Sequence, residues 1–390
     1  MSKILILGGD GYIGWPLSLY LSKNNHKVHI VDNFIKKFWE SQQGIEPLKS
    51  PLSLKKRLDI WNDISGFNIG YSVGDIAENP KFIYRVIDDF KPEAIVHLAE
   101  QPSAPYSMIG RSQAFETQRN NVLGTLNLMF AIQKSCPSAH LIKLGTMGEY
   151  GQPNIDIEEG WLNIKHNGRE DKLLYPKSPG SFYHASKVHD STNLEFACRT
   201  WGFKVTDLNQ GVVYGVQTNE TKLSDKLSTS FHYDDIFGTV INRFMTQSVV
   251  EHPLTIYGNG TQTRAYIYLE DALKCIEIAI NNPAKEGEFR VFNQFTEQFD
   301  LNFLAKLISE ASKEIGIKTI IENIKNPRVE KENHFFNAIA NNLPSLGLNP
   351  TKLTKSLLSN MMMFIQKYKD DIDRSKLIPK VQWNRDLKVN

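Results

Sequence analysis

Tyr183 and Lys187 are four residues apart in a stretch with a helical pattern, and Thr146 ends a predicted strand. Residues at i and i+4 share one face of a helix. A neighbouring ammonium group lowers the pKa of a phenol, so such a tyrosine can take a proton from a substrate hydroxyl at neutral pH. With fourteen tyrosines in the chain the pair alone is weak support, and the addition of Thr146 makes acid–base chemistry the favoured interpretation.

A second group of residues is suited to phosphate binding. The glycine-rich segment Gly8–Gly14 follows an apolar run and opens a helical pattern. Gly8 permits a tight turn, Gly11 lets backbone N–H groups approach a pyrophosphate, and Gly14 permits close helix packing. A plain tight turn is the alternative for the glycines alone, but strand, turn and helix in register favour a dinucleotide site.

Asp32 ends the second predicted strand, where an acid binds the adenine ribose and repels a 2′-phosphate. Asp32 therefore favours NAD over NADP, although Lys36 and Lys37 point mildly the other way. Further cofactor contacts are expected where the third and fourth strands end, at Asp75, Ile76, Leu98 and Ala99.

The elements that must position these residues alternate between strands and helices. The predicted strands are Lys3–Leu7, Lys27–Val31, Asn68–Val73, Ala94–Leu98, Leu141–Leu144 and Lys204–Leu208. The predicted helices are Trp15–Lys23, Lys81–Phe90, Gln113–Gln133, Ser181–Trp201, Leu269–Ile280, Leu301–Ile315 and Leu353–Lys369. This alternation predicts an α/β fold with a Rossmann-like, doubly wound parallel sheet.

The rhythm of the pattern changes near Gly211. We expect a dinucleotide-binding domain over residues 1–211 and a smaller α+β substrate-binding domain over 212–390, with segments at about 238–275 returning to the first domain. The stretch Trp161–Lys177 is expected to form a long loop over the site.

Composition excludes several classes of protein. The 390 residues carry a formal net charge of +2, which gives no general attraction for nucleic acid. No apolar run is long enough for a membrane span, and Ile4–Leu7 is too short for a signal peptide. Three distant cysteines predict a reducing, cytoplasmic compartment without a zinc site. No metal site is expected, because His189, His232 and His252 lack ligand spacing.

Taken together, Gly8–Gly14, Asp32, Asn121–Thr125, Thr146, Tyr183 and Lys187 resemble the extended short-chain dehydrogenase/reductase family, whose members modify nucleotide sugars with a tightly held NAD. A second set is similar to one branch, the UDP-sulfoquinovose synthases, over nearly the whole chain. This set comprises Gly9–Trp15, Glu100-Gln101, Ser103–Met108, Gly145–Gly151, Phe182–His184, Lys187–Ser191, Asp207–Gly211 and Asn326–Glu330.

The resemblance implies that UDP-glucose and sulfite are joined to give UDP-sulfoquinovose. Tyr183 would deprotonate the glucose 4-hydroxyl while hydride passes to NAD, and the 4-ketone would acidify the C5 proton. Loss of the 6-hydroxyl gives a 4-keto-5,6-ene, sulfite adds at C6, and the hydride returns to C4.

Elimination needs a base at C5 and an acid at the 6-hydroxyl. Sugar 4,6-dehydratases of the family carry an Asp-Glu pair where this chain has Met147 and Gly148. The nearest replacements are Glu149 and His184, and their roles as acid and base are left open. Glu149 could instead cap a turn, and His184 could be an ordinary histidine on a helix face.

The resemblance also implies the remaining contacts. Cofactor contacts would add Tyr12, Ile13, Asn33, Asn121, Leu144, Gln210 and Val213 to the residues above, with Lys36, Tyr183 and Lys187. Substrate contacts would come from Gln101, Thr146, Tyr183, Asn209, Gln262, Arg264 and Arg328. Two helices, Gln113–Gln133 and Ser181–Trp201, would form a homodimer interface.

Three positions depart from the branch pattern. Pro102 stands where we expect an arginine that would hold sulfite or the sugar, and Asn259 and Thr261 replace an expected lysine and glycine. The alternative hypothesis is therefore a related NAD-dependent UDP-sugar epimerase or dehydratase that does not use sulfite. A non-catalytic dinucleotide sensor on the same fold is disfavoured, because Tyr183, Lys187 and Thr146 are all present.

Overall fold

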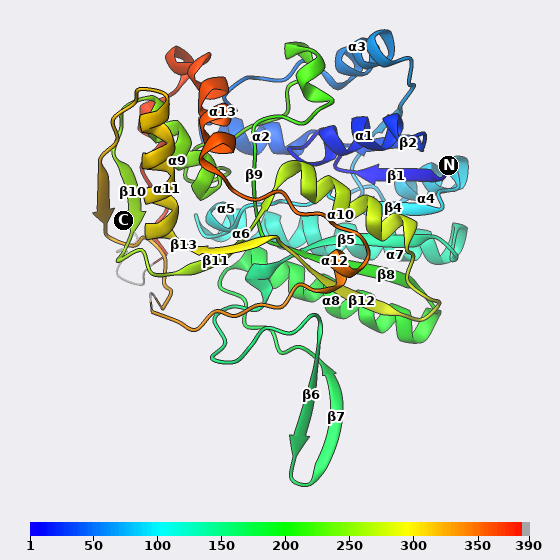
Figure 1. The fold of residues 1–390 in the computed structure, drawn as a ribbon. Coiled ribbons are helices and arrows are strands. Elements are labelled where there is room, and N and C mark those ends of the chain that lie inside the picture. Colours follow the sequence, from blue (N-terminus) through cyan, green and yellow to red (C-terminus); the bar gives the residue numbers. More distant parts are fainter. Residues whose placement is uncertain (332, 384–390) are drawn as a thin grey trace.

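The structure is a computed structural model that describes residues 1–331 and 333–383 (Figure 1). Its centre is a seven-stranded sheet in the order β12-β8-β5-β4-β1-β2-β3, in which every neighbouring pair is parallel. The strands are β1 (Lys3–Leu7), β2 (Lys27–Asp32), β3 (Gly70–Val73), β4 (Ala94–His97), β5 (His140–Thr146), β8 (Lys204–Gln210) and β12 (Phe289–Gln294). The strand order reverses between β1 and β4, which places a crevice at their carboxyl ends.

Both faces of this sheet are covered by helices, which confirms the predicted doubly wound fold. Ile4 and Ile6 point into a cluster beneath one group of helices, whereas Leu5 and Leu7 point into the cluster on the other face. The first group is α1 (Gly14–Lys23), α3 (Leu54–Ser65) and α10 (Leu269–Asn281). The second group is α4 (Pro80–Phe90), α7 (Gly124–Ser135) and α8 (Phe182–Trp201).

The helix expected over Gln113–Gln133 is interrupted. It consists of α6 (Arg111–Gln118), a π-helical turn over Arg119–Leu123, and α7. The turn buries Asn121, whose Nδ2 donates to the carbonyl oxygen of Gln101 at 3.2 Å and to Ser186 Oγ at 2.9 Å. This side chain therefore fixes the loop after β4 against α8. Because π turns are frequent at functional sites, the interruption of the helix marks this region as a candidate site.

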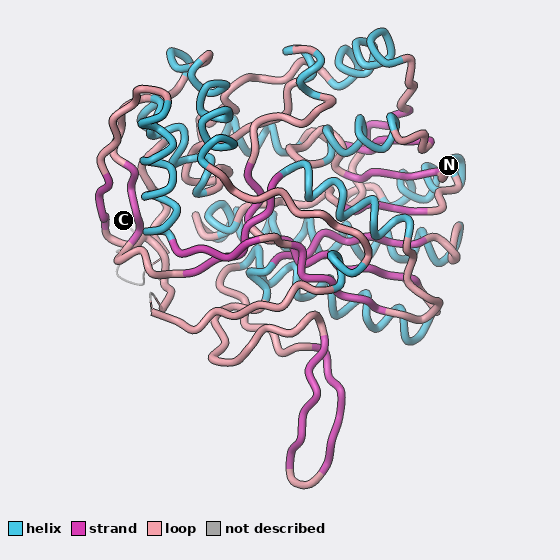
Figure 2. The backbone as a smooth tube through the Cα atoms, viewed as in Figure 1, coloured by secondary structure: helices cyan, strands magenta, loops and turns pink. Residues whose placement is uncertain are grey.

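The prediction of a long loop over Trp161–Lys177 is wrong, because most of this stretch forms a β-hairpin. Strands β6 (Trp161–His166) and β7 (Arg169–Leu174) pair antiparallel and project from the body of the molecule (Figures 1 and 2). Asn167 and Gly168 have φ of +47° and +77°. An Asn-Gly pair is a strong signal for a two-residue hairpin turn, and the sequence interpretation overlooked it.

The second half of the chain builds smaller sheets and a helical cluster. One sheet contains β9 (Val212–Tyr214), β11 (Thr263–Tyr268) and β13 (Glu297–Asp300), and another contains β10 (Leu254–Tyr257) and β14 (Ile321–Ile324). A separate apolar cluster joins α9 (Val240–Val249), α11 (Leu301–Glu314) and α13 (Lys355–Gln366). From this half, β12 is the edge strand of the large sheet beside β8, and α10 packs on one face of that sheet. The division of the chain at residue 211 stays a prediction.

Short elements complete the chain. They are α2 (Ile35–Gln42), α5 (Ala104–Ser107), α12 (Asn342–Ser345) and 3-10 turns at Met147–Glu149, Thr221–Leu223, Asp225–Leu227, Lys369–Asp371 and Arg374–Lys376.

Candidate active site

The turn between β1 and α1 requires glycine at two positions. Gly8 has φ +83°, and a Cβ there would lie 2.6 Å from the carbonyl carbon of Leu98. A Cβ at Gly14 would lie 2.1 Å from the carbonyl oxygen of Gly8. At Gly11 the nearest atom would be 3.4 Å away, so packing alone does not demand glycine there. Gly11 instead lines a cavity, which fits close approach by a phosphate.

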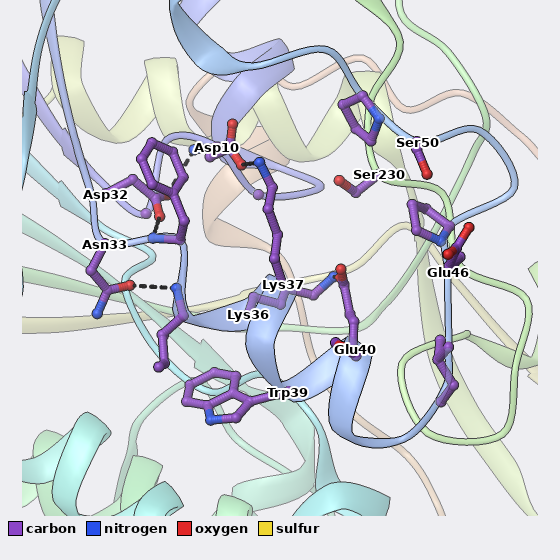
Figure 3. Close-up of a pocket in the computed structure, with 18 of the residues that line it drawn as sticks. Asp10, Asp32, Asn33, Lys36, Lys37, Trp39, Glu40, Glu46, Ser50 and Ser230 are labelled. Carbon is purple, nitrogen blue, oxygen red and sulfur yellow. Dashed lines mark hydrogen bonds and ion pairs between the residues drawn. The ribbon is translucent and has the colours of Figure 1, made fainter.

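That cavity has a volume of about 1050 Å³ (Figure 3). Helix α2 forms one wall, and Glu46, Ser50 and Ser230 lie on the opposite side (Figure 3). The predicted cofactor residues that line it are Gly8, Gly11, Asp32, Asn33, Lys36, Ile76, Leu98 and Ala99. The structure therefore brings residues from four separate segments to one cavity of the size that a dinucleotide needs.

Asp32 is held by backbone groups at the end of β2. Its Oδ2 accepts from the N–H of Asp10 and its Oδ1 from the N–H of Phe34, each at 2.8 Å. Burial raises the pKa of Asp32, and the nearby Asp10 carboxylate adds to the rise. Asp10 itself forms ion pairs with Arg57 and, at 2.8 Å, with Lys37 (Figure 3).

Lys36 and Lys37, the two lysines that weakly favoured NADP in the sequence, form ion pairs in the structure. Lys37 is bound to Asp10, while Lys36 Nζ lies 2.5 Å from Glu40 Oε1 and 2.8 Å from His232 Nε2. Both ammonium groups have carboxylate partners, so this wall of the cavity does not present an unopposed cation to a 2′-phosphate. The arrangement favours NAD.

The other predicted cofactor residues lie outside the lining of this cavity. Asp75 accepts from Asn33 at 2.7 Å, Tyr12 donates to the carbonyl of Gly215 at 2.6 Å, and Gln210 donates to Gln294 at 2.9 Å. Ile13, Leu144 and Val213 pack in or against the core beneath the sheet. Direct contact of these residues with a cofactor stays a prediction.

The predicted catalytic residues lie beside the cavity. Thr146 is the last residue of β5, and Tyr183 and Lys187 are in the first turns of α8. Lys187 pairs with Glu100, which lines the cavity. Thr146 Oγ1 accepts from the N–H of Gly148 at 3.2 Å and so caps the 3-10 turn that follows β5. Lys187 Nζ donates to the carbonyl of Leu144 at 2.6 Å and lies 2.5 Å from Glu100 Oε2. Its ammonium is 5.8 Å from the centre of the Tyr183 ring, which brings the predicted pair together.

The electrostatics of Tyr183 differ from the sequence expectation. Burial raises the pKa of its phenol; the Lys187 ammonium acts in the opposite direction without offsetting burial, and Glu100 adds to the rise. Burial acts to lower the pKa of Lys187, but the Glu100 carboxylate and the Tyr183 phenol together raise it. The expected lowering by the Lys187 ammonium is present, but burial and the Glu100 carboxylate, which the sequence does not reveal, leave the pKa of Tyr183 raised.

Glu149 belongs to a buried ion cluster. Its Oε1 lies 3.1 Å from Lys143 Nζ, and its Oε2 pairs with Lys177 and accepts from Ser191 Oγ at 3.1 Å. Burial alone would raise the pKa of Glu149, but the two ammonium groups outweigh it and hold the pKa at about 2. The carboxylate also accepts from the N–H of Thr146, so this geometry suits positioning of Thr146.

His184 stands in space that Gly148 leaves open. A Cβ on Gly148 would lie 2.3 Å from His184 Nε2, so any larger residue there would displace the imidazole. His184 Nδ1 is 3.1 Å from Ser181 Oγ. Burial lowers the pKa of His184 to about 4, and Arg328 and Arg264 contribute. The imidazole is therefore neutral at pH 7 and able to accept a proton.

Arg328 and Arg264 act electrostatically on His184, and Arg243 acts on Arg328. Arg264 pairs with Glu330, while Arg243 donates to Tyr257 Oη at 2.8 Å and is buried. Burial lowers the pKa of Arg328, and the charges of Arg264 and Arg243 act in the same direction. Among the described residues Glu330 is the carboxylate paired with this set, which leaves an excess of positive charge suited to a diphosphate.

Three predicted substrate residues carry buried polar atoms without partners among the described residues. These atoms are Gln101 Nε2, Asn209 Oδ1 and Gln262 Oε1. Their other atoms are bound: Asn209 Nδ2 donates to Tyr150 Oη at 2.8 Å, and Gln262 Nε2 donates to the carbonyl of Tyr257 at 2.7 Å. Buried polar groups are normally paired, so these atoms are available to a ligand that reaches them.

Sequence reasoning missed Glu100, Lys143, Lys177 and Arg243 as members of the site. Glu100 lies three residues after the end of β4, at the edge where ligands bind, and Lys143 is a charged residue inside an apolar strand. Both signals were present in the sequence. Lys177 and Arg243 have no such signal, because their partners Glu149 and Tyr257 lie 28 and 14 residues away.

Two further properties concern the described part of the chain. No group of three or more potential metal ligands is found there. None of its helices is both long and apolar enough to cross a membrane.

Comparison with known proteins gives the family. The model of the NAD dependent epimerase/dehydratase family matches residues 4–293. The chain is 50% identical to the chloroplastic UDP-sulfoquinovose synthase of Spinacia oleracea over 383 residues, which covers 98% of this chain and 79% of the relative. It is 39% identical to the UDP-sulfoquinovose synthase of Sulfolobus acidocaldarius over 389 residues, covering 98% of both chains.

Solved structures share the fold. A UDP-glucuronic acid 4-epimerase of Bacillus cereus, in complex with UDP-glucuronic acid and NAD, matches with a TM-score of 0.67 at 20% identity. The UDP-glucose 4-epimerase of Thermotoga maritima with UDP-glucose gives the same two values. Each match covers 94% of this chain and 99% of the other.

Proposed function

Because the chain belongs to the NAD-dependent epimerase/dehydratase family and, within it, to the UDP-sulfoquinovose synthases, we propose that it converts UDP-glucose and sulfite into UDP-sulfoquinovose. The observation that carries the proposal is the neutral imidazole of His184, which lies beside Tyr183 in the space left by Gly148. A second proton-transfer group next to the tyrosine suits an elimination, which simple epimerisation at C4 does not require.

NAD fits the cavity at the first turn and supplies an acceptor that takes a hydride from the sugar and returns it. The N–H groups of the Gly8–Gly14 turn would bind its pyrophosphate, and Asp32 would bind the adenine ribose. Ile76, Leu98 and Ala99 would form the walls beside them.

Tyr183 is proposed to take the proton of the glucose 4-hydroxyl, with the Thr146 hydroxyl hydrogen-bonded to the same oxygen. Lys187 stabilises the tyrosinate, and Glu100 holds the ammonium in place. Glu149 is proposed to act through Thr146, since its carboxylate accepts from the Thr146 backbone and is enclosed by two lysines.

His184 is proposed to serve the elimination as base and then as acid. The 4-ketone acidifies the C5–H bond, and the neutral imidazole takes that proton. The resulting imidazolium gives the proton to the departing 6-hydroxyl, which leaves as water. Bisulfite then forms a C–S bond at C6 of the unsaturated ketone while C5 regains a proton, so atoms and charges balance.

The UDP group is proposed to bind at the arginine cluster. Arg264 and Arg328 would bind the diphosphate, because guanidinium groups bind phosphate bidentately and stay charged. Gln262, Asn209 and Gln101 would use their unpartnered polar atoms for the rest of the nucleotide sugar.

A related enzyme that does not use sulfite is the second candidate, and Pro102 favours it. Pro102 is exposed at the start of the segment leading to α5, and proline offers neither a charge nor an N–H donor to an anion. If the protein is such an enzyme, it should convert UDP-glucose to a different UDP-sugar in the absence of sulfite.

The test is to incubate the purified protein with UDP-glucose, with and without sulfite, and to identify the products by mass and by NMR. Our proposal predicts UDP-sulfoquinovose that depends on sulfite. Net conversion of UDP-glucose to an epimer or a 4-keto-6-deoxy sugar without sulfite would establish the second candidate instead.

We also propose that the protein is a cytoplasmic homodimer. The support for a dimer is a surface of exposed apolar side chains along α6, α7 and α8, which includes Phe115, Phe182 and Phe196. The support for a reducing compartment is that Cys136, Cys198 and Cys275 are buried and free.

A further inference from the structure

The last described stretch, Lys376–Trp383, links segments that are far apart in the sequence, and we refer to it as the strap. Lys376 Nζ donates to the carbonyl of Gln43 at 3.0 Å, just beyond α2. The backbone N–H of Lys380 donates to Asp235 Oδ2 at 2.7 Å. Val381 packs against an apolar cluster made of Trp39, Ile45, Tyr106 and Ile236. Since Trp39 lines the cofactor cavity, the strap is attached to that cavity's wall.

At its other end the strap reaches the arginine cluster. The backbone N–H of Trp383 donates to the carbonyl of Pro327 at 2.8 Å. The guanidinium carbon of Arg328 lies 5.2 Å from the centre of the Trp383 ring. One short segment thus contacts both the wall of the cofactor cavity and the side chain that we assign to the diphosphate.

Arg328 differs from its two neighbours in how its side chain is held. Arg264 pairs with Glu330, and Arg243 donates to Tyr257 and to the carbonyl of Thr255. The Arg328 side chain has no hydrogen bond or ion pair within the described part of the chain. Its guanidinium lies over the ring of Trp383 instead.

A guanidinium group on an aromatic face is attracted through its own flat face. The N–H groups of a guanidinium lie in its own plane, so contact with a ring uses none of these donors and leaves them for bidentate binding of phosphate oxygens. A carboxylate partner would instead occupy those N–H groups, as Glu330 does at Arg264. Contact with tryptophan therefore orients Arg328 without using its phosphate-binding edge.

We propose that Trp383 is a positioning residue that orients Arg328 for the diphosphate of the nucleotide sugar, and that the strap holds Trp383 in place. This inference rests on the proposed function, since it requires that Arg328 binds the diphosphate. Trp383 is given no part in the chemistry.

The experiment measures UDP binding by calorimetry, together with KM and kcat for UDP-glucose, in the full chain. Trp383→Ala should weaken UDP binding and raise KM about tenfold, the effect of a cation–π contact in a partly enclosed site, with kcat unchanged. Trp383→Phe keeps an aromatic face and should restore most of the affinity. Ile378→Ala, at an exposed position on the same strap, is the matched control and should match the wild type.

A double-mutant cycle separates positioning from a general loss of structure. In an Arg328→Gln background, adding Trp383→Ala should change UDP affinity little, because the guanidinium that it orients is gone. An equal loss in both backgrounds, or unchanged affinity in Trp383→Ala, would overturn the inference. Wild-type protein that binds neither UDP nor UDP-glucose would instead overturn the proposed function.

Discussion

At the scale of single residues, the site depends on the close packing of His184 against Gly148, which has no side chain. Gly148 stands where the family resemblance implies a carboxylate in sugar 4,6-dehydratases, and the imidazole of His184 lies in the space where a side chain on Gly148 would be. The sequence identified both positions, because the departure from the dehydratase pattern was visible. It could not show that the two residues are in contact, since 36 positions separate them.

His184→Gln tests the role of the imidazole. We expect kcat to fall about 100-fold or more, the usual contribution of an acid–base group, while UDP binding is kept. The hydride step should survive, so reduced cofactor should still appear by absorbance when UDP-glucose is added. His189→Gln, an exposed change on the same helix, is the control. Wild-type turnover in His184→Gln would contradict the assignment.

Glu100 raises the proton affinity of both members of the catalytic pair. Its carboxylate raises the pKa of Tyr183, so removing its charge should lower that pKa. A base with a lower pKa is deprotonated at lower pH, and the ascending limb of kcat/KM against pH should therefore move to lower pH in Glu100→Gln. Glu195→Gln, which removes an exposed ion pair with Arg199 on α8, should leave the profile in place. A shift of Glu100→Gln to higher pH would refute this account.

At the scale of elements, a buried ion pair joins the segment after the hairpin to the turn after β5. The Lys177 side chain, three residues beyond β7, is 4% exposed and pairs with Glu149. The helices and strands with clear periodicity were predictable within a few residues at their ends. The hairpin was predictable from its Asn167-Gly168 turn, which the sequence interpretation did not use. The pairing of Lys177 with Glu149 was not predictable, because it arises only through long-range packing.

Lys177→Met should weaken this connection. Removing one partner of a buried ion pair destabilises a protein by about 3 kcal/mol, and Lys165→Met, at an exposed pair on the hairpin itself, should cost about 0–1 kcal/mol. Denaturant unfolding of both variants measures the difference. Equal midpoints for Lys177→Met and Lys165→Met would show that the buried pair does not stabilise the fold.

The buried ion cluster around Glu149 makes the free energy of unfolding depend on pH. The pKa of Glu149 is held at about 2, below its ordinary 4.5, so the folded state binds fewer protons at this group than the unfolded state does. Its contribution to stability is therefore complete above about pH 4.5 and is lost as the pH falls towards 2. In Lys177→Met the loss of stability on acidification through this window should be smaller.

At the scale of the whole molecule, the fold class and cofactor type followed from the sequence because strand periodicity and the glycine turn are local signals. The second half returns to the large sheet through β12, and the residues of Phe289–Gln294 do not show that its partner is β8, more than 80 positions earlier. The position of the strap against Arg328 likewise arises only when distant segments pack together.

The exposed apolar surface of α6 and α8 predicts the oligomeric state. Phe196 is 50% exposed on α8, and a charge there should prevent a second copy from packing on this surface. Light scattering should find the wild type dimeric and Phe196→Glu monomeric. Phe303→Glu, a similar change at a 46% exposed position on α11, should stay dimeric. A dimer in Phe196→Glu would place the interface elsewhere.

The central claim is that sulfite is the nucleophile at C6 despite Pro102. The most direct measurement supplies sulfur-labelled sulfite with UDP-glucose to the purified protein and locates the label in the product by mass spectrometry and NMR. We predict that the label is bound to C6 of the sugar in UDP-sulfoquinovose. Consumption of UDP-glucose without incorporation of the label, at any sulfite concentration, would contradict the claim.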